Sequence, residues 1–157
     1  MRCLCVATCG RRKIWDVDPN APRFVEARSA YIGPLSKLTI KYAQKFHPND
    51  YVILSAKYGF LLPHEKIENY DAYCNRNPLI KISELKRQIH EKRTYSGLLL
   101  SEYDKVIVLG GRCYCNWVKK VFGEDKVECP ITGLAIGKMM KKISDAIKSG
   151  VPLVSCP

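Results

Sequence analysis

The stretch that decides the fold is Tyr51-Val52-Ile53-Leu54-Ser55, which leads into Ala56-Lys57-Tyr58-Gly59. Its first four residues are aromatic, β-branched or aliphatic, a composition typical of a strand that is covered on both faces. Arg2–Thr8 and Lys105–Leu109 have the same character. A short fourth strand is predicted at residues 125–128. Three apolar strands spread along the chain indicate one buried sheet.

Helices are predicted between these strands. Apolar residues recur at spacings of three and four, the period of an amphipathic helix, over residues 35–46, 79–89, 117–122 and 136–147. A shorter helix is predicted at residues 23–31, and residues 56–77 are predicted to form a long irregular loop. Such loops in compact domains are usually functional. Alternating strands and helices predict a single α/β domain over residues 1–157, three-layered, with a mostly parallel sheet of about four strands and helices on both faces.

The chain is strongly basic. Its 157 residues carry 26 Lys and Arg against 15 Asp and Glu, a formal net charge of +11. This balance favours an anionic partner, nucleic acid or a nucleotide, over the alternative of a generally lysine-rich proteome. No apolar run approaches the ~20 residues that cross a bilayer, and no signal-peptide core is present. We therefore expect a cytoplasmic protein without a membrane partner.

Eight cysteines are present, and their spacing argues against a metal site. Cys113 and Cys115 are separated by one residue on a predicted helix, where such neighbours point in different directions. No pair of Cys-x-x-Cys elements exists, so no zinc site is predicted. Cys3 and Cys5 share one face of a strand and are expected to pack as small apolar residues. Disulfides remain the alternative.

Parallel sheets bind ligands at the carboxyl ends of their strands. This rule selects residues 9–13, 55–59 and 110–114, which we predict meet around one cavity. Arg11, Lys13 and Lys57 are expected to hold phosphate, and Tyr58 and Tyr70 to stack on a base. The ligand-binding residues predicted in this way are Cys9, Gly10, Arg11, Lys13, Ser55, Tyr58, Gly59, Tyr70, Gly110, Gly111 and Tyr114.

The catalytic candidates are Lys57, Asp71 and Glu68. Asp71, or else Glu68, is expected to move a proton as general base or acid. Cations beside Cys9 would favour a thiolate there, although a structural thiol is the preferred interpretation. The histidines have no metal-ligand spacing, and His47 and His90 are expected on the surface. No phosphate-binding loop, dinucleotide fingerprint or nucleophile elbow is present, and the sequence leaves the identity of any cofactor unknown.

Several of these segments resemble motifs of a known family. Cys9-Gly10-Arg11-Arg12-Lys13 resembles its Cys-Gly-x-x-Lys element. Residues 54–61, followed by Pro63, Ile67, Tyr70 and Asp71, resemble its Leu-Ser-Ala-Lys-Tyr-Gly-Leu…Pro…Ile…Tyr-Asp signature. Residues 27–34, 108–114 and 130–137 resemble three further elements, with Gly33 where the family has Ser.

The family is an uncharacterised prokaryotic and phage domain family. Its central motif is similar to that of the YaaA peroxide-stress proteins and of an internal domain of archaeosine synthase, a transfer-RNA modification enzyme. The resemblance implies association with nucleic acid and, in one form, nucleobase chemistry.

Three functional hypotheses follow. The first is a nucleic-acid- or nucleotide-associated protein, with an enzyme acting on a nucleobase or its N-glycosidic bond as one form of it. The second is a non-catalytic DNA- or RNA-binding module that uses the basic helix faces around Arg87 and Lys141. The third is a small-molecule nucleotide sensor.

Overall fold

A five-stranded sheet forms the centre of the computed structural model, which describes all residues 1–157. The strand order is β4-β3-β1-β6-β7. The strands are β1 (Cys3–Thr8), β3 (Tyr51–Ser55), β4 (Gly59–Leu61), β6 (Lys105–Leu109) and β7 (Val127–Glu128). All pairs are parallel except β3 with β4. The predicted mostly parallel sheet is confirmed, with one strand more than expected.

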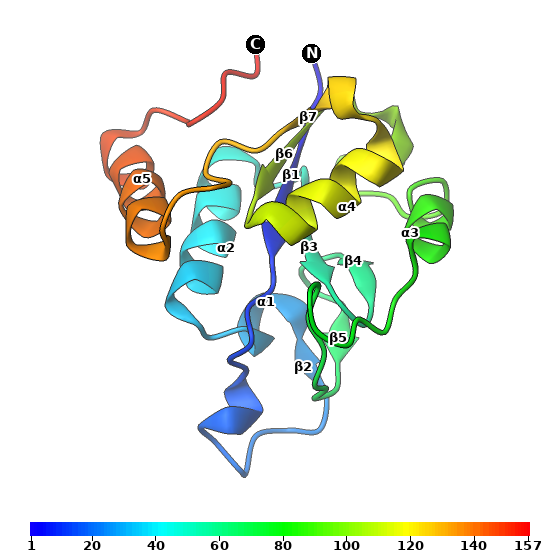
Figure 1. The fold of residues 1–157 in the computed structure, drawn as a ribbon, viewed down its shortest axis with the longest axis vertical. Coiled ribbons are helices and arrows are strands. Elements are labelled where there is room, and N and C mark those ends of the chain that lie inside the picture. Colours follow the sequence, from blue (N-terminus) through cyan, green and yellow to red (C-terminus); the bar gives the residue numbers. More distant parts are fainter.

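Helices cover both faces of this sheet, which gives the three layers predicted (Figure 1). On one face, α2 (Pro34–Phe46) packs against β1 and α5 (Ile136–Ser149) packs against α2. On the other, α4 (Arg112–Phe122) packs against β6, and α3 (Ile82–Gln88) against β4 and α4. None of the helices is long and apolar enough to cross a membrane.

The parallel register brings the carboxyl ends of the three central strands to one edge. Val6 of β1 pairs with Val52 on one side and with Val108 on the other. Thr8, the last residue of β1, pairs with Leu54, and Ala7 pairs with Leu109. The loops that follow these strands therefore start side by side, as the ligand-binding rule for parallel sheets requires.

The segment predicted as an irregular loop, residues 56–77, contains two strands, and that prediction was wrong. One is β4, and the other is β5 (Lys66–Ile67), which pairs antiparallel with β2 (Val25–Glu26). Strands of two or three residues are too short for a periodic pattern to reveal. The predicted helix at residues 23–31 is shorter in the structure, α1 (Ala27–Ala30), because Val25 and Glu26 belong to β2. The remaining elements are single 3₁₀ turns at Ile14–Asp16, Leu100–Glu102 and Glu124–Lys126.

His47 is buried, which corrects its expected surface position. It lies at the end of α2 with 8% of its surface exposed, and its Nε2 atom has no hydrogen-bond partner. Burial lowers its pKa, and the nearby Asp50 offsets part of this effect. His90 is exposed, as expected.

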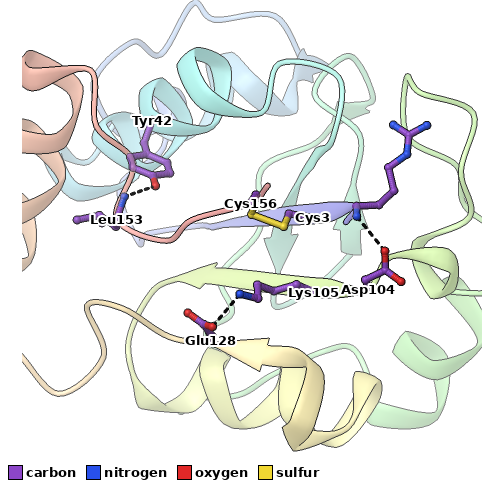
Figure 2. Close-up of a disulfide and its surroundings, with 8 residues drawn as sticks. Cys3, Tyr42, Asp104, Lys105, Glu128, Leu153 and Cys156 are labelled. Carbon is purple, nitrogen blue, oxygen red and sulfur yellow. Dashed lines mark hydrogen bonds and ion pairs between the residues drawn. A yellow bond between two sulfur atoms is a disulfide. The ribbon is translucent and has the colours of Figure 1, made fainter.

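Six of the eight cysteines form disulfides: Cys3–Cys156, Cys74–Cys113 and Cys115–Cys129. Figure 2 shows the first, which joins the start of β1 to the C-terminal segment. The expectation that Cys3 packs as a small apolar side chain was therefore wrong, because its partner lies 153 residues away in sequence. Cys5 and Cys9 are free and buried.

Candidate functional site

A pocket of about 740 Å³ opens at the carboxyl ends of β1 and β6. The loop after β1 and the start of α4 contribute to it, together with the start of α5 and the segment around Tyr73. Its lining residues are Thr8, Cys9, Arg11, Leu35, Tyr73, Cys74, Asn75, Gly111, Arg112, Cys113, Tyr114, Gly133, Leu134, Ile136 and Met139.

The charge in this pocket is entirely positive. Arg11 and Arg112 line it, and no Asp or Glu does. Both arginines are exposed and neither takes part in an ion pair. The Arg11 guanidinium lies over the Tyr73 ring, with its central carbon 4.6 Å from the ring centroid. Two unpaired guanidinium groups without a competing carboxylate favour an anionic ligand.

The N-terminus of α4 adds backbone donors to the same place. Gly111 is the N-cap residue and provides no side-chain cap, and the first helical bond runs from the Cys115 N–H to the Gly111 carbonyl. The N–H groups of residues 112–114 therefore have no partner within the helix. A Cβ added at Gly111 would have no atom within 4 Å, so this backbone is open. Such a helix end attracts anions.

Part of the lining is apolar and consists of Leu35, Leu134, Ile136 and Met139. Ile136 is 64% exposed and Leu134 36%, so the apolar surface continues from the pocket to its rim. A flat apolar group could pack there while the anion lies against the arginines.

Cys9 and Tyr114 form a buried pair that also lines this pocket. The Cys9 Sγ and the Tyr114 hydroxyl are 3.0 Å apart and share a hydrogen bond. Burial raises the pKa of Tyr114, so its hydroxyl stays protonated. Cys9 is the one free thiol among the lining residues.

Beside the pocket, the end of β3 is held by a chain of hydroxyl groups. The Ser55 Oγ accepts hydrogen bonds from the backbone N–H groups of Lys57 and Tyr58, both at 3.1 Å. It lies 2.8 Å from the Tyr70 hydroxyl, which is 2.6 Å from that of Tyr31. Because Ser55 already accepts two bonds, its own hydrogen is free for Tyr70. Burial raises the pKa of both tyrosines.

Two lysines face the Tyr70 ring. The Nζ atoms of Lys13 and Lys57 lie 4.3 and 6.0 Å from its centroid. Lys13 is buried, its Nζ donates to the Arg11 carbonyl at 3.2 Å, and burial lowers its pKa. Neither lysine lines the pocket. Tyr70, which is 9% exposed, is held in the core and offers little open ring surface for a stacked base.

The carboxylates predicted to move a proton lie outside the pocket lining. Glu68 forms an ion pair with Arg23 at 3.2 Å. Asp71 is exposed in the loop that follows Tyr70. Lys57, the third catalytic candidate, has its Nζ 5.0 Å from the centroid of the Tyr58 ring.

Of the predicted ligand-binding residues, Cys9, Arg11, Gly111 and Tyr114 line the pocket. The segments after β1 and β6 thus meet, whereas the one after β3 packs around Tyr70. The other three glycines are set by packing or by a turn. An added Cβ would lie 2.6 Å from the Ser36 Oγ at Gly10 and 2.5 Å from the Thr8 Cγ2 at Gly110. Gly59 has a φ of +75°.

Sequence reasoning missed most of the remaining lining residues. Arg112 follows the double glycine directly, and its position at a helix start was a usable signal. Tyr73 to Asn75 lay inside the segment that was expected to be functional. Leu134, Ile136 and Met139 come to the pocket because α5 packs on α2, and nothing in the sequence pattern indicated that packing.

Comparison with known proteins gives two similarities. Residues 17–145 match the model of a family described as a family of unknown function (DUF6884). The chain is 35% identical over 153 residues to "Uncharacterized protein YfjM" from Bacillus subtilis (strain 168), covering 94% of this chain and 97% of that protein. No solved structure matches.

Proposed function

Starting from the membership of this chain in the DUF6884 family, we propose that it binds a nucleotide, free or within a nucleic-acid strand, in the pocket at the ends of β1 and β6. The observation that carries this proposal is the composition of the lining. Two unpaired arginines and an open helix N-terminus line the pocket together with apolar side chains, and no carboxylate is present.

The phosphate of such a ligand belongs at the Arg112 end. Guanidinium groups bind phosphate oxygens through paired hydrogen bonds, and each charge-assisted bond contributes roughly 1.5–3 kcal/mol. The free N–H groups of residues 112–114 add donors of fixed direction. The chain's charge of +11 would also draw polyanions toward this site.

The base belongs against the wall formed by Leu35, Leu134 and Met139. The pocket volume, about 740 Å³, lies in the range of roughly 300–1,000 Å³ typical of organic ligands, and inorganic phosphate would leave most of it unfilled. The exposed rim at Leu134 and Ile136 leaves room for a strand to continue outward. The resemblance of residues 54–61 to the YaaA proteins and to a domain of archaeosine synthase supports the strand-bound form.

Chemistry on the base is the finer form of this proposal. Cys9, for which a structural thiol was the preferred interpretation from the sequence, lines the pocket beside Tyr114. Lys57, Asp71 and Glu68 lie outside the lining, so we assign them no catalytic step. A nucleotide sensor would use the same pocket, whereas a binding module would use the helix faces around Arg87 and Lys141.

Binding measurements test the proposal. Calorimetric titration of the purified chain with the four nucleoside monophosphates and with a 5′-phosphorylated single strand, at low salt, should detect at least one ligand. Arg112→Gln should lower the affinity for that ligand by roughly 10- to 100-fold, because one charge-assisted contact is lost. Gly111→Val, which adds a side chain to open space, should weaken it as well.

Arg87→Gln is the matched control, because it removes the same charge from the outer face of α3. If the ligand binds in the pocket, this variant should keep wild-type affinity. If Arg87→Gln weakens binding while Arg112→Gln and Gly111→Val do not, the binding-module hypothesis is supported and the pocket proposal is contradicted. If none of these ligands binds at low salt, the nucleotide proposal fails.

A further inference from the structure

Two irregular segments that contribute to the pocket, one around Cys74 and one that begins at Cys129, are joined to the start of α4 by disulfides. Cys113 bonds to Cys74, and Cys115, two residues later, bonds to Cys129, with Cα–Cα distances of 5.9 and 6.3 Å. Both cysteines of the first pair line the pocket, and neither of the second does. The Cys74–Cys113 bond is therefore part of the pocket wall itself.

The wall that Cys74 belongs to has few other attachments. Within residues 71–77, the backbone hydrogen bonds are those between Tyr73 and Arg76, at 3.0 and 3.3 Å, which close the segment on itself. No backbone-to-backbone hydrogen bond joins these residues to the rest of the chain. Besides the disulfide, three contacts hold them in place: the stacking of Arg11 on Tyr73, the burial of Ala72, and a hydrogen bond between the Cys74 backbone and the Tyr114 hydroxyl.

We propose that the Cys74–Cys113 bond is a reducible latch, whose reduction by a dithiol frees residues 71–77 and opens the pocket. Segments with few backbone bonds to their surroundings open at low free-energy cost once their cross-link is removed. Three lining residues, Tyr73, Cys74 and Asn75, would leave with the segment. Arg11 would lose the ring on which it lies.

The chemistry is ordinary thiol–disulfide exchange. A thiolate of the dithiol attacks the Sγ of Cys113, because Cys113 is more exposed than Cys74. The S–S bond breaks, and Cys74 leaves as a thiolate and takes up a proton. The second thiol of the dithiol then attacks the mixed disulfide. Cys113 is released as a thiol and the dithiol becomes a cyclic disulfide. Two electrons and two protons pass from the dithiol to the protein.

Cys9 supplies a readout that needs no ligand. It is 6% exposed and lines the pocket, whereas the other free thiol, Cys5, is completely buried. Alkylation of Cys9 by iodoacetamide, located by peptide mass spectrometry without reductant, therefore reports how open the pocket is. In Cys74→Ser/Cys113→Ser the rate should rise roughly tenfold or more over wild type. Adding Cys9→Ser to that variant should abolish the labelling.

Cys3→Ser/Cys156→Ser is the control for general loss of stability. It removes a cross-link at the other end of the sheet, one that closes the longer loop: 153 residues against 39. Cys9 in this variant should react at the wild-type rate, which separates local opening from unfolding. Equal rates in all three proteins, or a larger rise in the control, would overturn the proposal.

A second measurement covers the case in which the pocket variant does not fold. Wild type is titrated with dithiothreitol while circular dichroism monitors the fold, and the new thiols are mapped. Cys74 and Cys113 should become reactive at concentrations that leave the fold and Cys3–Cys156 intact. Their appearance only together with unfolding would overturn the latch. An effect of the latch on ligand binding rests on the proposed function. Neither the alkylation rate nor the dithiothreitol titration depends on a ligand, so a failure of the latch proposal can be distinguished from a failure of the proposed function.

Discussion

The hydroxyl of Tyr70 lies 2.8 Å from the Oγ of Ser55, so a residue from the segment between β5 and α3 closes the carboxyl end of β3. Tyr31 adds its hydroxyl at 2.6 Å from the other side. The three groups satisfy one another in a place where water is excluded. Tyr70, which was predicted to stack on a ligand base, is therefore placed as an anchor of the core.

Replacing Tyr70 by Phe tests this role. The ring remains, but the Ser55 and Tyr31 hydroxyls each lose a partner while staying buried, which costs about 1–3 kcal/mol in the free energy of unfolding. Urea denaturation measures the change. Tyr95→Phe is the matched control, because Tyr95 is 48% exposed and bonds the exposed His64 at 2.7 Å. A Tyr70→Phe protein as stable as wild type would contradict the anchoring role.

The double glycine after β6 separates into one structural and one open position. A Cβ at Gly110 would meet the Thr8 Cγ2 at 2.5 Å, at the contact between β1 and β6, whereas one at Gly111 would meet nothing within 4 Å. Gly110→Ala should therefore destabilise the fold by about 1–3 kcal/mol through overpacking. Gly111→Ala, at a φ of −80° open to any residue, should be neutral or stabilise it by up to about 1 kcal/mol.

Thermal unfolding of the two alanine variants, side by side, measures this difference. The substitution is the same and the positions are adjacent, so differences in composition or expression cancel. Equal melting temperatures would show that β1 and β6 have room for a side chain at Gly110, contrary to the packing described.

The sequence was sufficient for the sheet and its helices because long apolar runs and three-to-four spacing are local signals. Tyr51–Ser55, Lys105–Leu109 and the helix at Pro34–Phe46 were predicted within a residue or two. Sites were harder. Arg11 and Gly111 follow strands and were found, but Leu134 and Met139 reach the pocket through packing of α5 on α2. Such contacts depend on the tertiary arrangement, which no local spacing encodes.

The cysteines illustrate the same limit. Alternation correctly placed Cys3 and Cys5 on one strand, and helical geometry correctly separated Cys113 from Cys115. The disulfide partners of Cys3, Cys113 and Cys115 are Cys156, Cys74 and Cys129, respectively. These partners lie in irregular segments, where spacing in the sequence gives no information about distance in space.

The Cys3–Cys156 bond should contribute strongly to stability, because it closes a loop of 153 residues between the two ends of the chain (Figure 2). Cross-links of this length restrict the unfolded chain most, and Cys3→Ser/Cys156→Ser should lower the free energy of unfolding by about 2–5 kcal/mol. Guanidinium denaturation without reductant measures this loss. A smaller loss is expected for Cys115→Ser/Cys129→Ser, which opens a loop of 14. The reverse order would contradict the loop-length argument.

His47 should make stability depend on pH. Burial holds its native pKa below the ordinary value of 6.5, although Asp50 opposes this effect. Below about pH 6.5 the unfolded chain therefore binds a proton that the folded protein resists, and stability falls as the pH falls. The contribution is fully present above that value and is lost toward the lower native pKa. Urea denaturation at about pH 7 and about pH 5 measures this loss for wild type and for His47→Phe.

The Phe variant should lose less stability than wild type between the two pH values, because it has no group to titrate and its ring still packs against Tyr42, 6.2 Å away between ring centroids in the wild type. His90→Gln is the control, since it removes an exposed imidazole and should keep the wild-type pH dependence. Because Nε2 of His47 has no hydrogen-bond partner, an apolar ring gives up no bond at that atom. An unchanged pH dependence in His47→Phe would mean that the buried imidazole is not the titrating group.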